Sequence, residues 1–125
     1  MRNLFRILTL SVSALTLAAV TGLATIQAEE AKVSEEALAK GKEIAFDVMQ
    51  GNCLACHMIT GGELPGNIGP PLIAMKARFP ERDALRAQIY DARIKNPNTI
   101  MIPYGAHNVL NDEEIDLITD YIHTL

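Results

Sequence analysis

One short motif, Cys53-Leu54-Ala55-Cys56-His57, constrains this 125-residue chain more than any other feature, because it contains both of the cysteines. Two cysteines separated by two residues serve as a redox disulfide, as half of a zinc site, or as the attachment point of a c-type haem. Zinc usually takes four ligands, and the other two histidines, His107 and His123, are poorly spaced for a zinc finger. A thioredoxin-like pair lies between a strand and a helix, and no alternating β-branched pattern precedes Cys53.

Attachment of a haem accounts for every part of this motif. Its two thiols add to the vinyl groups on one porphyrin edge, and a single helical turn presents both sulfurs to that edge. The next residue, His57, then lies beneath the iron as its proximal ligand. We therefore predict one haem c, held covalently through Cys53 and Cys56. The chain has no Trp and only three Phe and three Tyr, so the haem would replace an aromatic core.

The N-terminus has the pattern of an export signal. Arg2 and Arg6 precede a stretch without charged side chains, 7–28, that ends in small residues. We predict a signal peptide over 1–28, cleaved after Ala24 or Ala28, and a periplasmic domain over 29–125. The alternative is a retained membrane anchor, although Thr, Ser and Gly dilute the apolar stretch. Removal of both arginines takes the net charge from −4 to −6, which argues against a nucleic-acid partner.

The rest of the chain reads as helices separated by two loops. Ser34 is a plausible N-cap for a helix over 35–49, and a second helix is expected over 81–95. Asn111, with Glu three residues later, predicts a capped C-terminal helix. Gly and Pro pairs place 59–80 and 96–110 in loops. The predicted fold is all-α, small and built around one covalently attached haem.

The sixth position of the iron needs a ligand from another part of the chain. Met101 is the strongest candidate, because it lies in a loop that follows a helix and can return over the open haem face. Met75 and His107 are the alternatives, whereas His123 falls on the polar side of its predicted helix. Iron closed on both sides suits electron transfer better than substrate chemistry. No catalytic group is evident.

Further residues are similar to a known family. The segment Lys40-Gly41-Lys42-Glu43-Ile44 resembles the first helix of class I cytochromes c, whose glycine contacts an aromatic residue of the last helix. Gly41 and Tyr121 would be that pair. Gly69-Pro70-Pro71-Leu72 resembles the loop in which a proline carbonyl, here Pro70, accepts the N–H of the proximal histidine. A fixed acceptor of this kind orients a ligating imidazole.

A narrower resemblance is to the SoxX family, the monohaem subunits of the sulfur-oxidation cytochromes SoxAX. It rests on the segments 51–57, 65–72, 79–93, 101–105 and 110–116. Many family members have Met-Pro-Pro-Phe-Gly where this chain has Met101-Ile102-Pro103-Tyr104-Gly105. The change loosens the loop slightly and keeps both the ligand and an aromatic ring.

This second resemblance implies partners and a role. The chain would form a heterodimer with a SoxA-like cytochrome, which joins thiosulfate to a cysteine of a SoxYZ-like carrier. It would accept the electrons and pass them to a soluble cytochrome c, as the electron-transfer subunit rather than the substrate-binding one. The alternatives are a free-standing cytochrome c and, less well supported, a haem enzyme or gas sensor. Arg82, Arg86 and Arg93 share one helix flank that would face an acidic partner, a haem propionate or solvent.

Overall fold

The computed structural model of the protein describes residues 33–125, so the predicted signal peptide over 1–28 lies outside the described residues. This part of the chain contains helices and loops and no strand, which confirms the all-α prediction. None of its helices is long and apolar enough to cross a membrane. The elements in chain order are α1 (Glu35–Phe46), η1 (Cys53–Ala55), α2 (Met75–Arg78), α3 (Arg82–Tyr90), η2 (Ala92–Ile94) and α4 (Asp112–His123).

The two longest helices, α1 and α4, begin at the predicted caps. The Ser34 side chain accepts a hydrogen bond from the Ala37 backbone N–H at 3.1 Å. Asn111 and Glu114 form a complete capping box, in which each side chain accepts from the other residue's backbone N–H at 2.9 Å. Caps of this kind satisfy N–H groups that the helix itself leaves unpaired.

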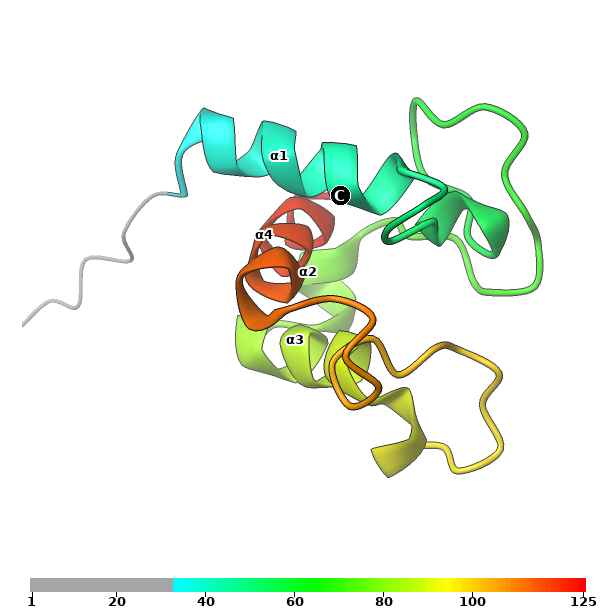
Figure 1. Ribbon diagram of the computed structural model, residues 1–125. Helices are drawn as coiled ribbons and strands as arrows, with labels where there is room; N and C mark the ends of the chain where they lie inside the picture. Colours follow the sequence, from blue (N-terminus) through cyan, green and yellow to red (C-terminus); the bar gives the residue numbers. More distant parts are fainter. Residues whose placement is uncertain (1–32) are drawn as a thin grey trace, which may run out of the picture. The chain divides into compact units, whose positions relative to one another are not determined.

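Helix α1 crosses α4 at Gly41, as expected from the family resemblance (Figure 1). A Cβ atom on Gly41 would lie 2.0 Å from the Leu117 carbonyl oxygen and 3.0 Å from the Tyr121 Cβ. Only a residue without a side chain permits such an approach. Tyr121 also makes an edge-to-face contact with Phe46, with ring centroids 6.2 Å apart.

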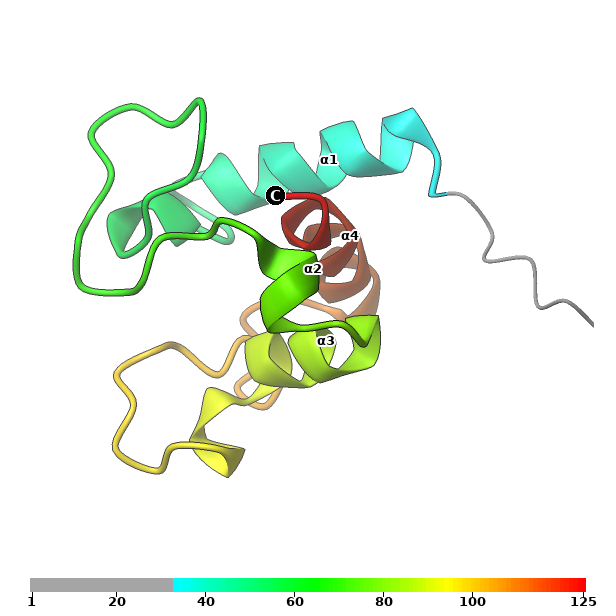
Figure 2. The ribbon, with the colours of Figure 1, turned by 180° about the vertical axis from the view of Figure 1, so that it is seen from behind.

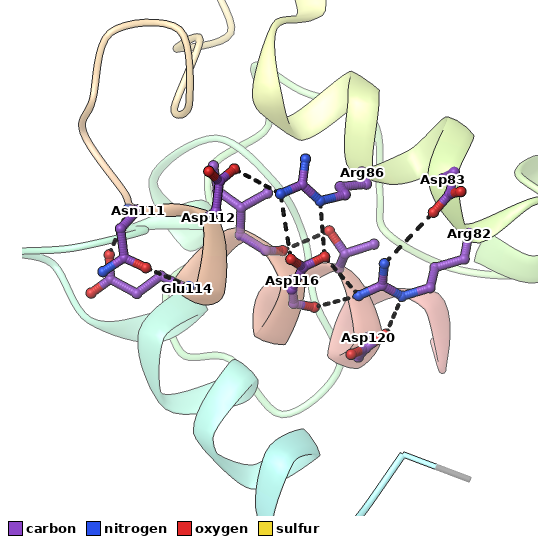
Figure 3. A network of polar contacts seen from close by, with 10 residues as sticks. Arg82, Asp83, Arg86, Asn111, Asp112, Glu114, Asp116 and Asp120 are labelled. Atoms are coloured by element: carbon purple, nitrogen blue, oxygen red, sulfur yellow. Dashed lines mark hydrogen bonds and ion pairs between the residues drawn. The ribbon is translucent and has the colours of Figure 1, made fainter. Parts of the chain in front are cut away.

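Arginines of α3 form ion pairs with aspartates of α4 (Figure 3). Arg82 contacts Asp116 at 3.0 Å and also pairs with Asp120. Arg86 contacts Asp116 at 2.9 Å and Asp112 at 2.8 Å. Hydrogen bonds from Arg86 and Arg82 lower the pKa of Asp116 below its ordinary value.

The third arginine of that flank, Arg93, also has an intramolecular partner. Its guanidinium donates to Asp91 at 2.8 Å, from Nε to Oδ1 and from Nη2 to Oδ2. Arg93 lies on η2 rather than on α3 and is exposed, as expected for a solvated charged side chain, whereas Arg82 and Arg86 are half-buried.

Two helices end earlier than the sequence predicts. Helix α1 stops at Phe46 because Asp47 adopts an extended conformation and its carboxylate accepts from the Met49 backbone N–H at 2.8 Å. Val48, which the helical spacing placed on the buried face, is 72% exposed. Helix α3 stops at Tyr90, and Asp91 caps the short η2 that follows.

The two predicted loops project toward the same side of the helices, in green and yellow in Figures 1 and 2. The first loop contains one helical turn that the sequence did not predict, α2. Its first backbone N–H, on Met75, donates to the Leu125 carbonyl at 2.7 Å. This contact joins the turn to the end of α4 and places it beside the space between the loops.

Candidate functional site

A cavity of about 470 Å³ lies between the two loops, within the size range of cofactor sites. All five residues predicted to hold the haem line this cavity, although they come from separate parts of the chain. They are Cys53, Cys56, His57, Pro70 and Met101. The structure therefore brings the whole predicted set together.

The cysteine motif forms a single tight turn. Asn52 adopts the left-handed conformation with φ 45°, and η1 starts directly after it. The Cys56 and His57 backbone N–H groups both donate to the Cys53 carbonyl, at 3.2 and 2.9 Å. Burial, with a smaller contribution from the nearby Cys56, raises the pKa of the Cys53 thiol to about 11. Nucleophilic and redox cysteines have lowered pKa values, so this environment disfavours a thioredoxin-like pair.

A second segment wraps the cysteine turn and positions His57. His57 Nδ1 lies 2.7 Å from the Pro70 carbonyl oxygen, the contact expected from the sequence. With the proton on Nδ1, the ring donates to that oxygen, and Nε2 is available to a metal. The backbone N–H of Gly66 donates to the Leu54 carbonyl oxygen at 2.7 Å, and that of Gly69 donates to the Cys56 carbonyl oxygen at 2.8 Å.

Two glycines of this segment were not singled out by the sequence as site residues. A Cβ on Gly69 would lie 2.3 Å from His57 Cε1, and one on Gly66 would lie 2.0 Å from the Ala55 carbonyl oxygen. Both glycines are needed because the segment lies directly against the cysteine motif. The sequence shows the spacing of these glycines, Gly66-Asn67-Ile68-Gly69, but it does not show that both of them pack against the cysteine motif.

Met101 lies in the opposite loop and borders the cavity as a half-buried side chain. Its backbone N–H donates to Thr99 Oγ1 at 3.2 Å. The loop is attached to the end of α3, where the Gly105 and Ala106 backbone N–H groups donate to the Tyr90 carbonyl at 3.1 and 3.2 Å. The loop therefore returns over the cavity, as the sequence predicted.

The alternative ligands differ in their positions. Met75 also borders the cavity, but it is 1% exposed and its sulfur accepts from the Arg78 guanidinium at 3.3 Å. His107 is not among the cavity-lining residues, and its Nε2 lies 3.0 Å from the Arg93 guanidinium. His123 was predicted to lie on the solvated face of its helix, and this prediction is wrong. Its Nε2 lies 2.8 Å from the Phe79 carbonyl oxygen.

Comparison with known families agrees with this geometry. Residues 36–122, more than two thirds of the chain, match the family model described as "Cytochrome C oxidase, cbb3-type, subunit III". The chain is a cytochrome c domain of this family. The match confirms a class I cytochrome c fold, covalent haem c and an electron-transfer haem protein. No curated protein is similar enough in sequence to register as a match.

The cavity of this cytochrome c domain has the chemistry that a haem requires. Apolar side chains dominate its walls, as the porphyrin ring needs, among them Leu72, Leu85 and Ile122. Among the cavity-lining residues, Arg78 is the single Lys or Arg, and its guanidinium donates to the Pro71 carbonyl at 2.8 Å. A lone cation in an apolar wall suits the anionic propionates of haem. No sequence motif had pointed to Arg78 as a site residue.

Proposed function

We propose that His57 and Met101 bind the two faces of the haem iron and that the protein transfers electrons through this six-coordinate centre. The observation that carries this assignment is that both side chains border one cavity that also contains Cys53 and Cys56. Bound haem supplies one-electron chemistry at its iron. With a protein ligand on each face, the chain leaves no open position for a substrate, which favours electron transfer over catalysis.

The two ligands act on the reduction potential in different ways. The Met101 thioether is neutral and soft, so it favours ferrous iron and raises the potential relative to bis-histidine ligation. The bond from His57 Nδ1 to the Pro70 carbonyl, at 2.7 Å, fixes the tautomer and increases the basicity of the ligating nitrogen.

Replacement of the two methionines that border the cavity tests the ligand assignment. A Met101→Ala protein should lose the near-infrared sulfur-to-iron band of the ferric state. A Met75→Leu protein should keep it, because leucine fills a similar volume without a sulfur ligand. Retention of the band in Met101→Ala, with its loss in Met75→Leu, would assign the ligand to Met75 instead.

We further propose that the chain is the periplasmic electron-transfer subunit of a SoxAX-type complex in thiosulfate oxidation. The resemblance to SoxX supports this role, because its segments extend from 51 to 116 and include both haem-bearing loops. The apolar N-terminal stretch after Arg2 and Arg6 supports export. The proposed partners are a SoxA-like cytochrome, a SoxYZ-like carrier reached through the complex, and a soluble cytochrome c as electron acceptor.

A free-standing electron carrier is the second candidate function. It is favoured by the cavity itself, since one chain supplies both predicted axial ligands and both attachment cysteines. Purification of the native protein from the periplasm separates the two functions. Recovery in a one-to-one complex with a second cytochrome would support the SoxAX-type role. A monomer without such a partner would support the free carrier, and recovery only from the cytoplasm would contradict both.

A further inference from the structure

Tyr104 connects the two loops that border the cavity. Its hydroxyl donates a hydrogen bond to the Gly51 carbonyl oxygen, across 53 residues of sequence. Gly51 lies two residues before Cys53, and Tyr104 lies three residues after Met101. The bond therefore joins the loop that carries the haem attachment cysteines to the loop that carries the proposed sixth ligand. Tyr104 itself lines the cavity and is 8% exposed.

The Gly51 end of this bond is fixed to helix α1. The Gly51 backbone N–H donates to the Ile44 carbonyl at 3.0 Å. A Cβ on Gly51 would lie only 2.6 Å from the same oxygen, so the peptide lies directly against the helix. The carbonyl that accepts from Tyr104 thus belongs to a buried, closely packed peptide rather than to a free loop.

The Tyr104 end is fixed as well. Its backbone carbonyl accepts from the Val109 and Leu110 N–H groups at 2.8 and 3.1 Å. Only Ile102 and Pro103 separate it from Met101, and proline restricts the backbone of that short connection. Movement of Met101 away from the iron therefore strains this connection or breaks the bond to Gly51.

The hydroxyl, rather than the ring, makes this connection. A phenylalanine could fill the same space but could not donate to Gly51. Burial raises the pKa of Tyr104 above its ordinary value, so the phenol stays protonated and able to donate at neutral and moderately alkaline pH.

We propose that the Tyr104 hydroxyl is a latch that keeps Met101 over the haem face, and that Tyr104 is a positioning residue for the sixth ligand. This inference rests on the proposed ligation by Met101. Loss of this hydrogen bond destabilises the loop that carries Met101 in its position over the haem and leaves the Gly51 carbonyl without its donor. External ligands of the ferric iron should then compete with Met101 more effectively.

Imidazole binding to the ferric holoprotein tests the latch. We expect Tyr104→Phe to bind imidazole about fivefold more tightly than wild type, the effect of one buried hydrogen bond of average strength. As the pH is raised, the near-infrared sulfur-to-iron band should also be lost at a lower pH in Tyr104→Phe than in wild type. Tyr121→Phe is the matched control, because Tyr121 is also 8% exposed and its ring packs on Phe46. It should bind imidazole as wild type does.

A Met101→Ala holoprotein, measured in parallel, separates failure of the latch from failure of the ligand assignment. If Met101→Ala loses the band and Tyr104→Phe binds imidazole like wild type, Met101 is the ligand, but the proposed positioning role of Tyr104 is wrong. If Met101→Ala retains the band, both are wrong. Equal gains in imidazole affinity in Tyr104→Phe and Tyr121→Phe would show general loosening of the fold and would overturn the specific role of Tyr104.

Discussion

Replacement of Gly41 by alanine sets two physical effects against each other. Alanine in place of glycine in a helix interior stabilises the helix by about 1 kcal/mol. At the α1–α4 crossing, however, the new Cβ would lie 2.0 Å from the Leu117 carbonyl oxygen and 2.6 Å from its carbon. Cβ atoms in real proteins essentially never approach other atoms within 3.0 Å, so the helices must separate by roughly 1 Å.

The clash involves backbone on one helix, so no flexible side chain can relieve it. Overpacking of a well-packed interface costs about 1–3 kcal/mol, and separation of the two helices adds lost contacts along the crossing. After the gain in helix propensity, we expect a net loss of about 2 kcal/mol. For a domain of this size, that loss lowers Tm by roughly 8–16 °C.

Thermal and denaturant unfolding of the holoprotein measure this loss. Ala39→Gly, at an exposed position of the same helix, is the matched control and should cost about 1 kcal/mol through helix propensity alone. Gly41 is not among the cavity-lining residues, so the visible spectrum of Gly41→Ala should match that of wild type. A Gly41→Ala protein more stable than wild type would refute the close-crossing argument, because only helix propensity would then be operating.

Two further predictions concern the haem ligand and the ion pairs. Gly69→Ala should displace the His57 ring, since the new Cβ would lie 2.5 Å from its Nδ1. Loss of the bond to Pro70 makes the histidine a weaker electron donor, so the reduction potential should rise, and an unchanged potential in redox titration would contradict this. Asp116→Asn should lower the free energy of unfolding by about 1 kcal/mol at pH 7. The reason is that Arg86 lowers the pKa of the Asp116 carboxyl, so the ionised form stabilises the fold. Its Tm difference from wild type should persist above about pH 5 and close as the pH falls below about 4, whereas a pH-independent difference would indicate packing.

Helix starts were predictable because their causes are local. The Ser34 cap and the Asn111 capping box involve partners only three residues away, so the sequence shows both donor and acceptor. Helix ends were less predictable. Apolar spacing continued to Val48, but the Asp47 carboxylate accepts from the backbone two residues on and competes with the helix. Helix α2 was missed because its first N–H is paired with Leu125, 50 residues away.

Charged side chains show the same division. Helical spacing correctly grouped Arg82 and Arg86 on one flank, but it could not indicate which surface that flank meets. Their partners, Asp112, Asp116 and Asp120, lie on another helix. An ion pair between helices depends on how those helices pack, which the spacing within either one does not encode.

The sequence by itself determined the chemistry of this protein, because the two cysteines and His57 are held at haem spacing by covalent connection alone. It also indicated Pro70 and Met101. The tertiary structure decided which side chains meet around the cavity: it brought Met101 and Met75 to its walls, paired His107 with Arg93, and placed Gly69 against His57. It also joined Tyr104 to Gly51, a bond that depends on two loops packing together. Contacts between residues so far apart in sequence form only when the helices and loops pack, so no local sequence pattern predicts them.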